Sequence, residues 1–164
     1  MDGFERRTEE KKKKVLRAAF DLMNTDTGIE NLTIDAVAKK ANVGKTSIFK
    51  YFGSKEKLIH EVFIRSMDEM GEKAKKIMEK NASFEETLIA MSQNKIDYLE
   101  KINKQFYLDL MSYYTKKEDS GFTRMMEAYT KQSFGIMLDL FHRGRKEGKV
   151  DLKYSDEFLM LYFQ

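Results

Sequence analysis

Residues 41–58 read ANVGKTSIFKYFGSKEKL, and the tetrapeptide GKTS at 44–47 matches the end of a phosphate-binding loop. A nucleotide-binding loop of that type needs a second glycine five residues before Gly44, because its backbone N–H groups wrap closely around the phosphates. That position holds Lys39. The loop should also follow a buried strand, whereas the preceding residues have the apolar spacing of an amphipathic helix. The sequence therefore argues against a nucleotide site.

Two short helices joined by a tight turn fit the same stretch far better. Thr33 is a good N-cap for the first helix. The apolar residues of that helix form one stripe, at Ile34, Val37, Ala38 and Ala41. Asn42 tolerates the left-handed backbone conformation that a tight turn needs. With a second helix over about residues 45–52, the pattern predicts a helix-turn-helix.

The second helix has two different sides. Its buried side is expected to carry Val43, Ile48 and Phe52. Its other side offers hydrogen-bond donors and aromatic rings, at Lys45, Thr46, Ser47, Phe49, Lys50 and Tyr51. Such a helix is short enough to lie in the major groove of DNA with these side chains near base edges or phosphates.

Helical periodicity covers most of the remaining chain, and no strand pattern of useful length appears. Ser54, Ser83 and Ser155 are expected N-caps, and Glu86 stands at capping-box spacing from Ser83. A bend is expected near Asn103. The predicted helices span about residues 11–24, 34–40, 45–52, 55–80, 84–117, 122–146 and 156–164. The predicted fold class is all-α.

Charge and composition limit the kind of protein. The net charge is +3, but residues 1–60 hold 13 basic and 9 acidic side chains, and residues 61–164 hold 17 and 18. Six lysines and one acid lie between Lys39 and Lys57, which suggests either a polyanionic partner or a solvated helix face. The chain has no cysteine, and so neither disulfides nor thiolate metal sites. With no membrane-length apolar run, we expect a cytoplasmic protein that does not enter a membrane.

Residues 32–63, LTIDAVAKKANVGKTSIFKYFGSKEKLIHEVF, resemble the N-terminal domain of the TetR family of bacterial transcriptional regulators. The family motif has an apolar residue and threonine opening the second helix, followed by A..AGVS.GTLY.YF.SKE.L. The positions in register are Leu32 to Ile34, Ala36 to Ala41, Val43, Ile48, Phe49, Tyr51, Phe52 and Ser54 to Leu58. Asn42 stands where glycine is usual. Gly44, Thr46, Phe49 and Lys50 also depart from the common residues, so the operator sequence does not carry over.

The resemblance implies a homodimer that binds a palindromic DNA operator and usually represses transcription. It implies a helix-turn-helix DNA-binding domain over residues 1–54 and a helical ligand-binding and dimerisation domain over 55–164. A small-molecule effector in the second domain would change the separation of the two reading helices. Neither an enzymatic activity nor a cofactor is expected.

We predict that eight residues contact DNA: Thr33, Lys45, Thr46, Ser47, Phe49, Lys50, Tyr51 and Lys55. Thr33 and Lys55 sit at helix N-termini, where backbone N–H groups also face phosphate. The alternative for each is a solvated side chain, and capping alone would explain Thr33. Phe49 either touches a thymine methyl group or packs.

Methionine and aromatic residues are dense in the later helices, where they form either the core or a plastic apolar pocket. The candidate ligand-binding residues are Phe106, Leu110, Met111, Tyr114, Met125, Met126, Tyr129 and Met137. His60 and His142 stand alone, and we assign no metal or catalytic role to either. No catalytic arrangement of side chains is legible from spacing.

The run FLMLYF at 158–163 is apolar on every side of a helix, and such a helix must be buried on both faces. We expect a dimer interface there, at Phe158, Leu159, Leu161, Tyr162 and Phe163. Regulators of this family usually continue for one more long helix, so either the chain is truncated or its dimer is atypical. Two other kinds of protein remain open, an all-helical nucleotide-dependent enzyme and a protein-interaction bundle that does not bind DNA.

Overall fold

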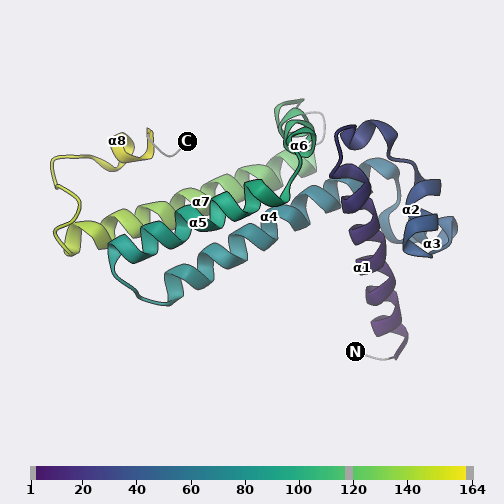
Figure 1. Cartoon of the computed structure of the whole chain (residues 1–164), viewed down its shortest axis with the longest axis horizontal. Helices are drawn as coiled ribbons and strands as arrows, with labels where there is room; N and C mark the ends of the chain where they lie inside the picture. The colour runs from purple at the N-terminus through teal and green to yellow at the C-terminus, as the bar shows by residue number, and fades with distance from the viewer. Residues whose placement is uncertain (1–2, 117–119, 162–164) are drawn as a thin grey trace. The chain divides into compact units, whose positions relative to one another are not determined.

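The computed structural model describes residues 3–116 and 120–161, and every α-helix and 3₁₀ turn named below lies within them. Figure 1 shows the helices in chain order. Their bounds are α1 (Gly3–Met23), η1 (Gly28–Asn31), α2 (Ile34–Ala41), α3 (Lys45–Phe52), α4 (Lys55–Glu79), α5 (Phe84–Lys101), α6 (Lys104–Lys116), α7 (Ser120–Lys146) and α8 (Asp156–Leu161). The described part of the chain contains no strand, which confirms the all-α prediction.

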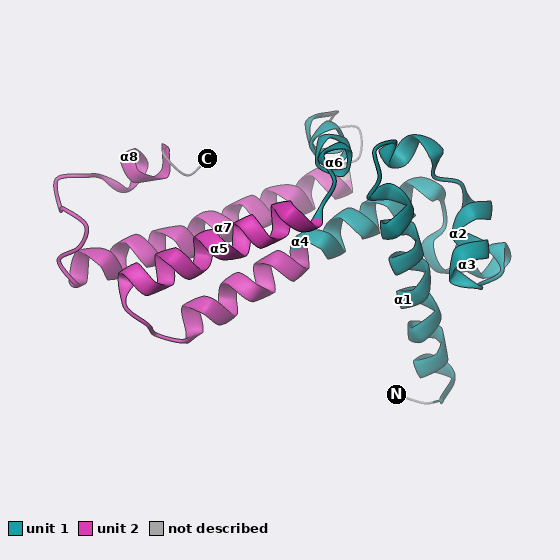
Figure 2. Cartoon of the chain, viewed as in Figure 1, with its two compact units in different colours: residues 1–67, 102–116 teal, residues 68–101, 117–164 magenta. Residues whose placement is uncertain are grey.

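The chain packs as two compact units (Figure 2). Unit 1 comprises residues 1–67 and 102–116, and unit 2 comprises residues 68–101 and 117–164. The helix α4 belongs to both, because its first turns pack in unit 1 and its later turns in unit 2. The functional division expected at residue 54 is a different kind of boundary and stays a prediction.

Unit 1 is built around a core of aliphatic and aromatic side chains from α1, α2, α3, α4 and α6. Phe106 of α6 is fully buried, and its ring meets Phe20 of α1 at 5.3 Å and Phe63 of α4 at 5.2 Å, both edge to face. Edge-to-face pairs at this separation are favourable beyond their burial. The aromatic cluster therefore joins α6 to the first helices of the chain.

Polar contacts fasten the start of α6 to the segment after α1. The Asn103 backbone N–H donates to Asn24 Oδ1 at 2.6 Å, and the Ile29 N–H donates to Asp109 Oδ2 at 2.9 Å. Gly28 has a φ of +55°, and a Cβ there would collide with the Asp109 carboxylate. Glycine is needed at this point both for the left-handed backbone and for the close approach of α6.

Unit 2 contains the end of α4 with α5, α7 and α8. Its core centres on Phe84, Leu140, Phe141 and Met160. The α4–α5 connection is held by Arg143 of α7, which donates to the carbonyls of Met78 (3.3 Å) and Ala82 (3.2 Å) and to Thr87 Oγ1 (3.2 Å). The Met78 and Ala82 carbonyls also accept from the Asn81 N–H and the Thr87 hydroxyl, so Arg143 gives each a second donor.

The predicted helix ends agree with the structure where a capping side chain marks them. The side chains of Ser54 and Ser155 accept from the backbone N–H groups of Lys57 (3.1 Å) and Phe158 (3.2 Å). Ser83 and Glu86 form the predicted capping box, with bonds of 3.1 and 3.3 Å.

Three boundaries differ from the prediction. α1 begins at Gly3 rather than near residue 11, with its first turns supported by the ion pairs Arg6–Glu10 and Lys12–Glu9. The expected bend near Asn103 is a break, because Asn103 Oδ1 caps α6 by accepting from the Gln105 N–H at 2.7 Å. α7 begins at Ser120 rather than residue 122. None of the described helices has a stretch long and apolar enough to cross a bilayer.

Candidate nucleic-acid interface

The turn between α2 and α3 has the geometry that the sequence predicts. Thr33 Oγ1 caps α2 by accepting from the Ala36 N–H at 3.1 Å. Asn42 ends that helix in the left-handed conformation, with φ 52° and ψ 47°. The Val43 N–H donates to the Ala38 carbonyl at 3.1 Å, which closes the end of α2, and α3 starts after Gly44.

Burial fixes which side of α3 faces outward. Ile48 is 1% exposed, and Val43 and Phe52 are also buried, which confirms the predicted inner side. Phe49 is 48% exposed. The other predicted DNA contacts are exposed at Thr33, Lys45, Thr46, Lys50 and Lys55, and half-buried at Ser47 and Tyr51. The predicted DNA contacts that belong to α3 therefore share its outward side, which we call the α3 outer face. Thr33 and Lys55 lie instead at the N-termini of α2 and α4.

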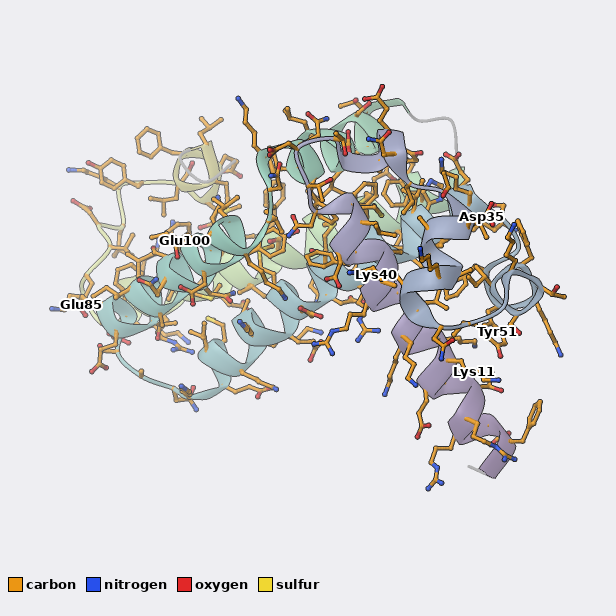
Figure 3. All side chains as sticks on the ribbon, turned by 45° about the vertical axis from the view of Figure 1, so that its right-hand side comes forward. Lys11, Asp35, Lys40, Tyr51, Glu85 and Glu100 are labelled. Atoms are coloured by element: carbon orange, nitrogen blue, oxygen red, sulfur yellow. The ribbon has the colours of Figure 1, made fainter. Side chains whose placement is uncertain are left out.

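The lysines of the predicted basic patch are not equivalent. Lys40 pairs with Asp21 of α1 at 3.5 Å, and Lys45 pairs with Asp35 of α2. Figure 3 labels Lys40 and Asp35 on α2. By contrast, Lys50 and Lys55 have no carboxylate partner among the residues that the structure describes. Their charges are therefore available to an external anion without first breaking an ion pair.

A groove of about 530 Å³ lies between α1 and the α3 outer face, within unit 1. From α3 it is lined by Ser47, Lys50 and Tyr51. From α1 it is lined by Phe4, Arg7, Thr8, Lys11 and Lys12. We call this surface the α1–α3 groove. Figure 3 shows Lys11 and Tyr51 near one another on the two helices. Sequence reasoning missed the α1 residues, although the run KKKK at 11–14 was a signal for a basic surface.

The eight candidate ligand-binding residues are divided between the units. Phe106, Leu110, Met111 and Tyr114 belong to unit 1, and Met125, Met126, Tyr129 and Met137 belong to unit 2. Phe106, Leu110 and Met126 are buried, and Met125 is exposed. Several have structural partners: Phe106 packs in the aromatic cluster, Met137 packs against the core of unit 2, and the Tyr129 hydroxyl donates to the Asp68 carboxylate.

The predicted dimer residues of α8 are partly described. Phe158 and Leu161 are exposed, and Leu159 packs against the core of unit 2 beside the buried Met160. Tyr162 and Phe163 lie outside the described residues. His142 and Arg145 of α7 hold α8 by bonding the Asp156 carboxylate at 2.9 and 2.5 Å. The hydrogen bond with His142, and to a smaller extent that with Arg145, holds the pKa of Asp156 below its ordinary value.

The two histidines have local partners. His60 is buried, with its ring edge to face against Tyr113 at 5.4 Å and its Nε2 3.7 Å from the Glu56 carboxylate. No group of three or more metal-ligating side chains occurs in the described ranges 3–116 and 120–161.

Residues 15–62 match the model of a family described as bacterial regulatory proteins, tetR family. Over 79 residues the chain is 40% identical to an uncharacterized HTH-type transcriptional regulator, YhgD, of Bacillus subtilis (strain 168). This alignment covers 48% of the present chain and 41% of YhgD, so it spans less than half of that relative.

Three solved structures share the fold. The fatty acid degradation regulator FadR from Bacillus halodurans has a TM-score of 0.70 and is 17% identical, over 90% of this chain and 75% of its own. The TetR family regulator PfmR from Thermus thermophilus has a TM-score of 0.68 and is 20% identical, over 87% of this chain and 75% of its own. FadR from Bacillus subtilis, in complex with stearoyl-CoA, has a TM-score of 0.66 and is 16% identical, over 88% of this chain and 76% of its own. At these identities the likeness concerns the fold alone.

Proposed function

Because its N-terminal domain makes this chain a member of the TetR family of bacterial regulatory proteins, we propose that it is a DNA-binding transcriptional regulator. The observation that carries the proposal is the α3 outer face. Ile48 and Phe52 hold one side of α3 in the core, and the other side presents Lys50 without a carboxylate partner among the described residues. A short helix with donors on its outer side suits the major groove, where base edges and phosphates accept hydrogen bonds.

The proposed regulator acts in the cytoplasm as a homodimer on a palindromic operator and represses transcription. One short helix covers too little of a duplex for tight specific binding, so two must act together, about 34–36 Å apart on one side of B-DNA. The proposed interface is formed by Phe158, Leu159, Leu161, Tyr162 and Phe163. The exposure of Phe158 and Leu161 supports this choice, because each leaves apolar surface to cover.

A small apolar or amphipathic effector is proposed to release the DNA, through some or all of the eight candidate ligand-binding residues. Methionine-rich surfaces adapt to irregular apolar ligands, which supports this chemistry. The stearoyl-CoA bound to the Bacillus subtilis FadR is one amphipathic molecule held by a protein of the same fold. An effector need only favour a dimer with a different spacing of the two α3 helices, since population shift follows differential affinity.

Titration with duplex DNA at increasing salt tests the proposal. Contacts from Lys45, Lys50 and Lys55 in two subunits would neutralise about six phosphates, so log affinity should fall with log salt at a slope of roughly −5. The same measurement on Lys95→Ala, an exposed lysine of α5 in unit 2, is the matched control and should give the same slope. A slope near zero would favour a nucleotide-dependent enzyme or an interaction bundle instead.

A further inference from the structure

Apart from Phe4, the lining of the α1–α3 groove consists of cations and hydroxyl groups. Arg7, Lys11, Lys12 and Lys50 are cations, three further residues carry hydroxyl groups, and no carboxylate is part of the lining. All of these side chains can donate hydrogen bonds, and only the hydroxyls can also accept them. Such a surface suits a ligand made of acceptors with negative charge, and a phosphate group has that character.

Helical periodicity places most of the groove lining of α1 on one face of that helix. Phe4, Thr8, Lys11 and Val15 lie at i, i+4, i+7 and i+11, so they share one face. Val15 is buried in the core of unit 1, so the groove is lined by the N-terminal continuation of the packing face of α1. Glu5, Glu9 and Glu10 are not among the lining residues, although Glu9 borders the groove through its ion pair with Lys12.

Only part of this charge is already compensated. Lys12 pairs with Glu9 at 2.9 Å, and Arg7 Nε donates to the Gly3 carbonyl at 3.0 Å. Lys11 and Lys50 have no carboxylate partner among the described residues, although they come from different helices and line the same groove. Like charges gathered in this way destabilise a surface unless an anion occupies it.

We propose that the α1–α3 groove holds a backbone phosphate of the same duplex that α3 reads. The first turns of α1 then form a second DNA contact, which adds affinity without reading sequence. This inference rests on the proposed function. A duplex is favoured over a free phosphate compound because Ser47, Lys50 and Tyr51 belong both to the groove and to the α3 outer face. A strand whose bases face α3 therefore brings its phosphates to the groove.

The test compares Lys11→Ala with Lys13→Ala. Both lysines are exposed and lie on α1, but Lys13 is not part of the groove. A random-sequence duplex of about 30 bp is a sufficient probe, because phosphate contacts do not depend on sequence. When KCl is raised from 50 to 200 mM, the affinity of the unmodified chain for the duplex should fall further than that of Lys11→Ala. The difference between the two losses should be about three- to fourfold per bound subunit. Its salt slope should be shallower by about 0.9 for each subunit, and Lys13→Ala should keep the original slope.

The outcomes separate this inference from the proposed function. If the unmodified chain does not bind the duplex, the proposed function fails and the groove contact fails with it. If it binds but the two variants have the same slope, only the groove contact is overturned. Sodium pyrophosphate at constant ionic strength, followed by tyrosine fluorescence, is the second arm. Saturable binding that Lys11→Ala abolishes, with no change in the duplex slope, would overturn the proposal in favour of a free-anion site. Equal melting temperatures of the variants would show that folding does not cause the difference.

Discussion

At the turn between α2 and α3, one asparagine holds a backbone conformation that most residues avoid. Asn42 has φ 52° and ψ 47°, and its N–H group and that of Val43 close the end of α2. For a residue with a Cβ the left-handed conformation costs about 1–2 kcal/mol, least for asparagine and most for β-branched side chains. The orientation of the α3 outer face therefore depends on a residue that does not lie on it.

We predict that Asn42→Val lowers the free energy of unfolding by about 1 kcal/mol or more, because valine is β-branched and strained at positive φ. Asn42→Gly should leave it unchanged or raise it slightly. Urea unfolding followed by circular dichroism measures both. If valine were tolerated as well as glycine, the left-handed turn would not be a feature of the protein in solution.

Lys50 should contribute to binding rather than to folding. Lys50→Ala is expected to weaken binding to the operator by about 1–3 kcal/mol if the side chain reads a base. The melting temperature should stay nearly constant, because the Lys50 side chain is exposed and has no carboxylate partner in the described ranges. An electrophoretic or anisotropy titration with the operator gives the affinity. A large loss of stability with unchanged affinity would mean that α3 presents its other side.

Among the elements, those with local signals could be predicted from the sequence, and those held by distant contacts could not. α2 and α3 have an N-cap, an apolar stripe and a left-handed asparagine within 20 residues of one another, and their bounds agree with the prediction. The first turns of α1 lack apolar periodicity and depend on ion pairs, so they were missed. The docking of α6 in unit 1 depends on the hydrogen bond between Ile29 and Asp109, which are 80 residues apart. Hydrophobic periodicity predicts local helices and does not predict a contact at that separation.

The connection between α4 and α5 depends on one side chain of α7. Arg143 is half-buried and bonds three acceptors from that connection and the start of α5. Arg143→Ala should lower the free energy of unfolding by about 1.5–3 kcal/mol, as expected for the loss of hydrogen bonds from a charged donor. Lys146→Ala, exposed on the same helix, is the control and should have little effect. Denaturant unfolding compares the two, and equal effects would remove the role given to Arg143.

The attachment of α8 should depend on pH. Since the folded pKa of Asp156 is lowered, its ionised form stabilises the folded state. That contribution is fully present above the unfolded pKa, which is about 3.9, and it is lost as pH falls through the lower folded value. Hydrogen exchange of the α8 amides between neutral pH and about pH 3 should show faster opening at the acidic end. In Asp156→Asn the opening should already be faster at neutral pH.

At the scale of the whole molecule, the central question is assembly. A regulator that reads a palindrome needs two copies of α3, and the exposed Phe158 and Leu161 are apolar surface that a second copy would cover. We predict a dimer in sedimentation experiments at micromolar concentration. Phe158→Asp should shift it towards monomer, whereas Lys153→Arg, which keeps the positive charge at an exposed position nearby, should not. A strict monomer for the unmodified chain would contradict the interface at α8.

The contact of α6 with η1 has a consequence for synthesis of the protein. The aromatic cluster of unit 1 needs Phe106, and the segment after α1 needs Asp109, so neither can be completed until α6 has left the ribosome. While α5 is being translated, Phe20 and Phe63 of the nascent chain therefore lack their contacts with Phe106. Loop closure over such a separation is slow compared with local helix formation. Protease resistance of nascent chains should accordingly appear only once residue 116 has emerged, well after the helix-turn-helix itself has been made.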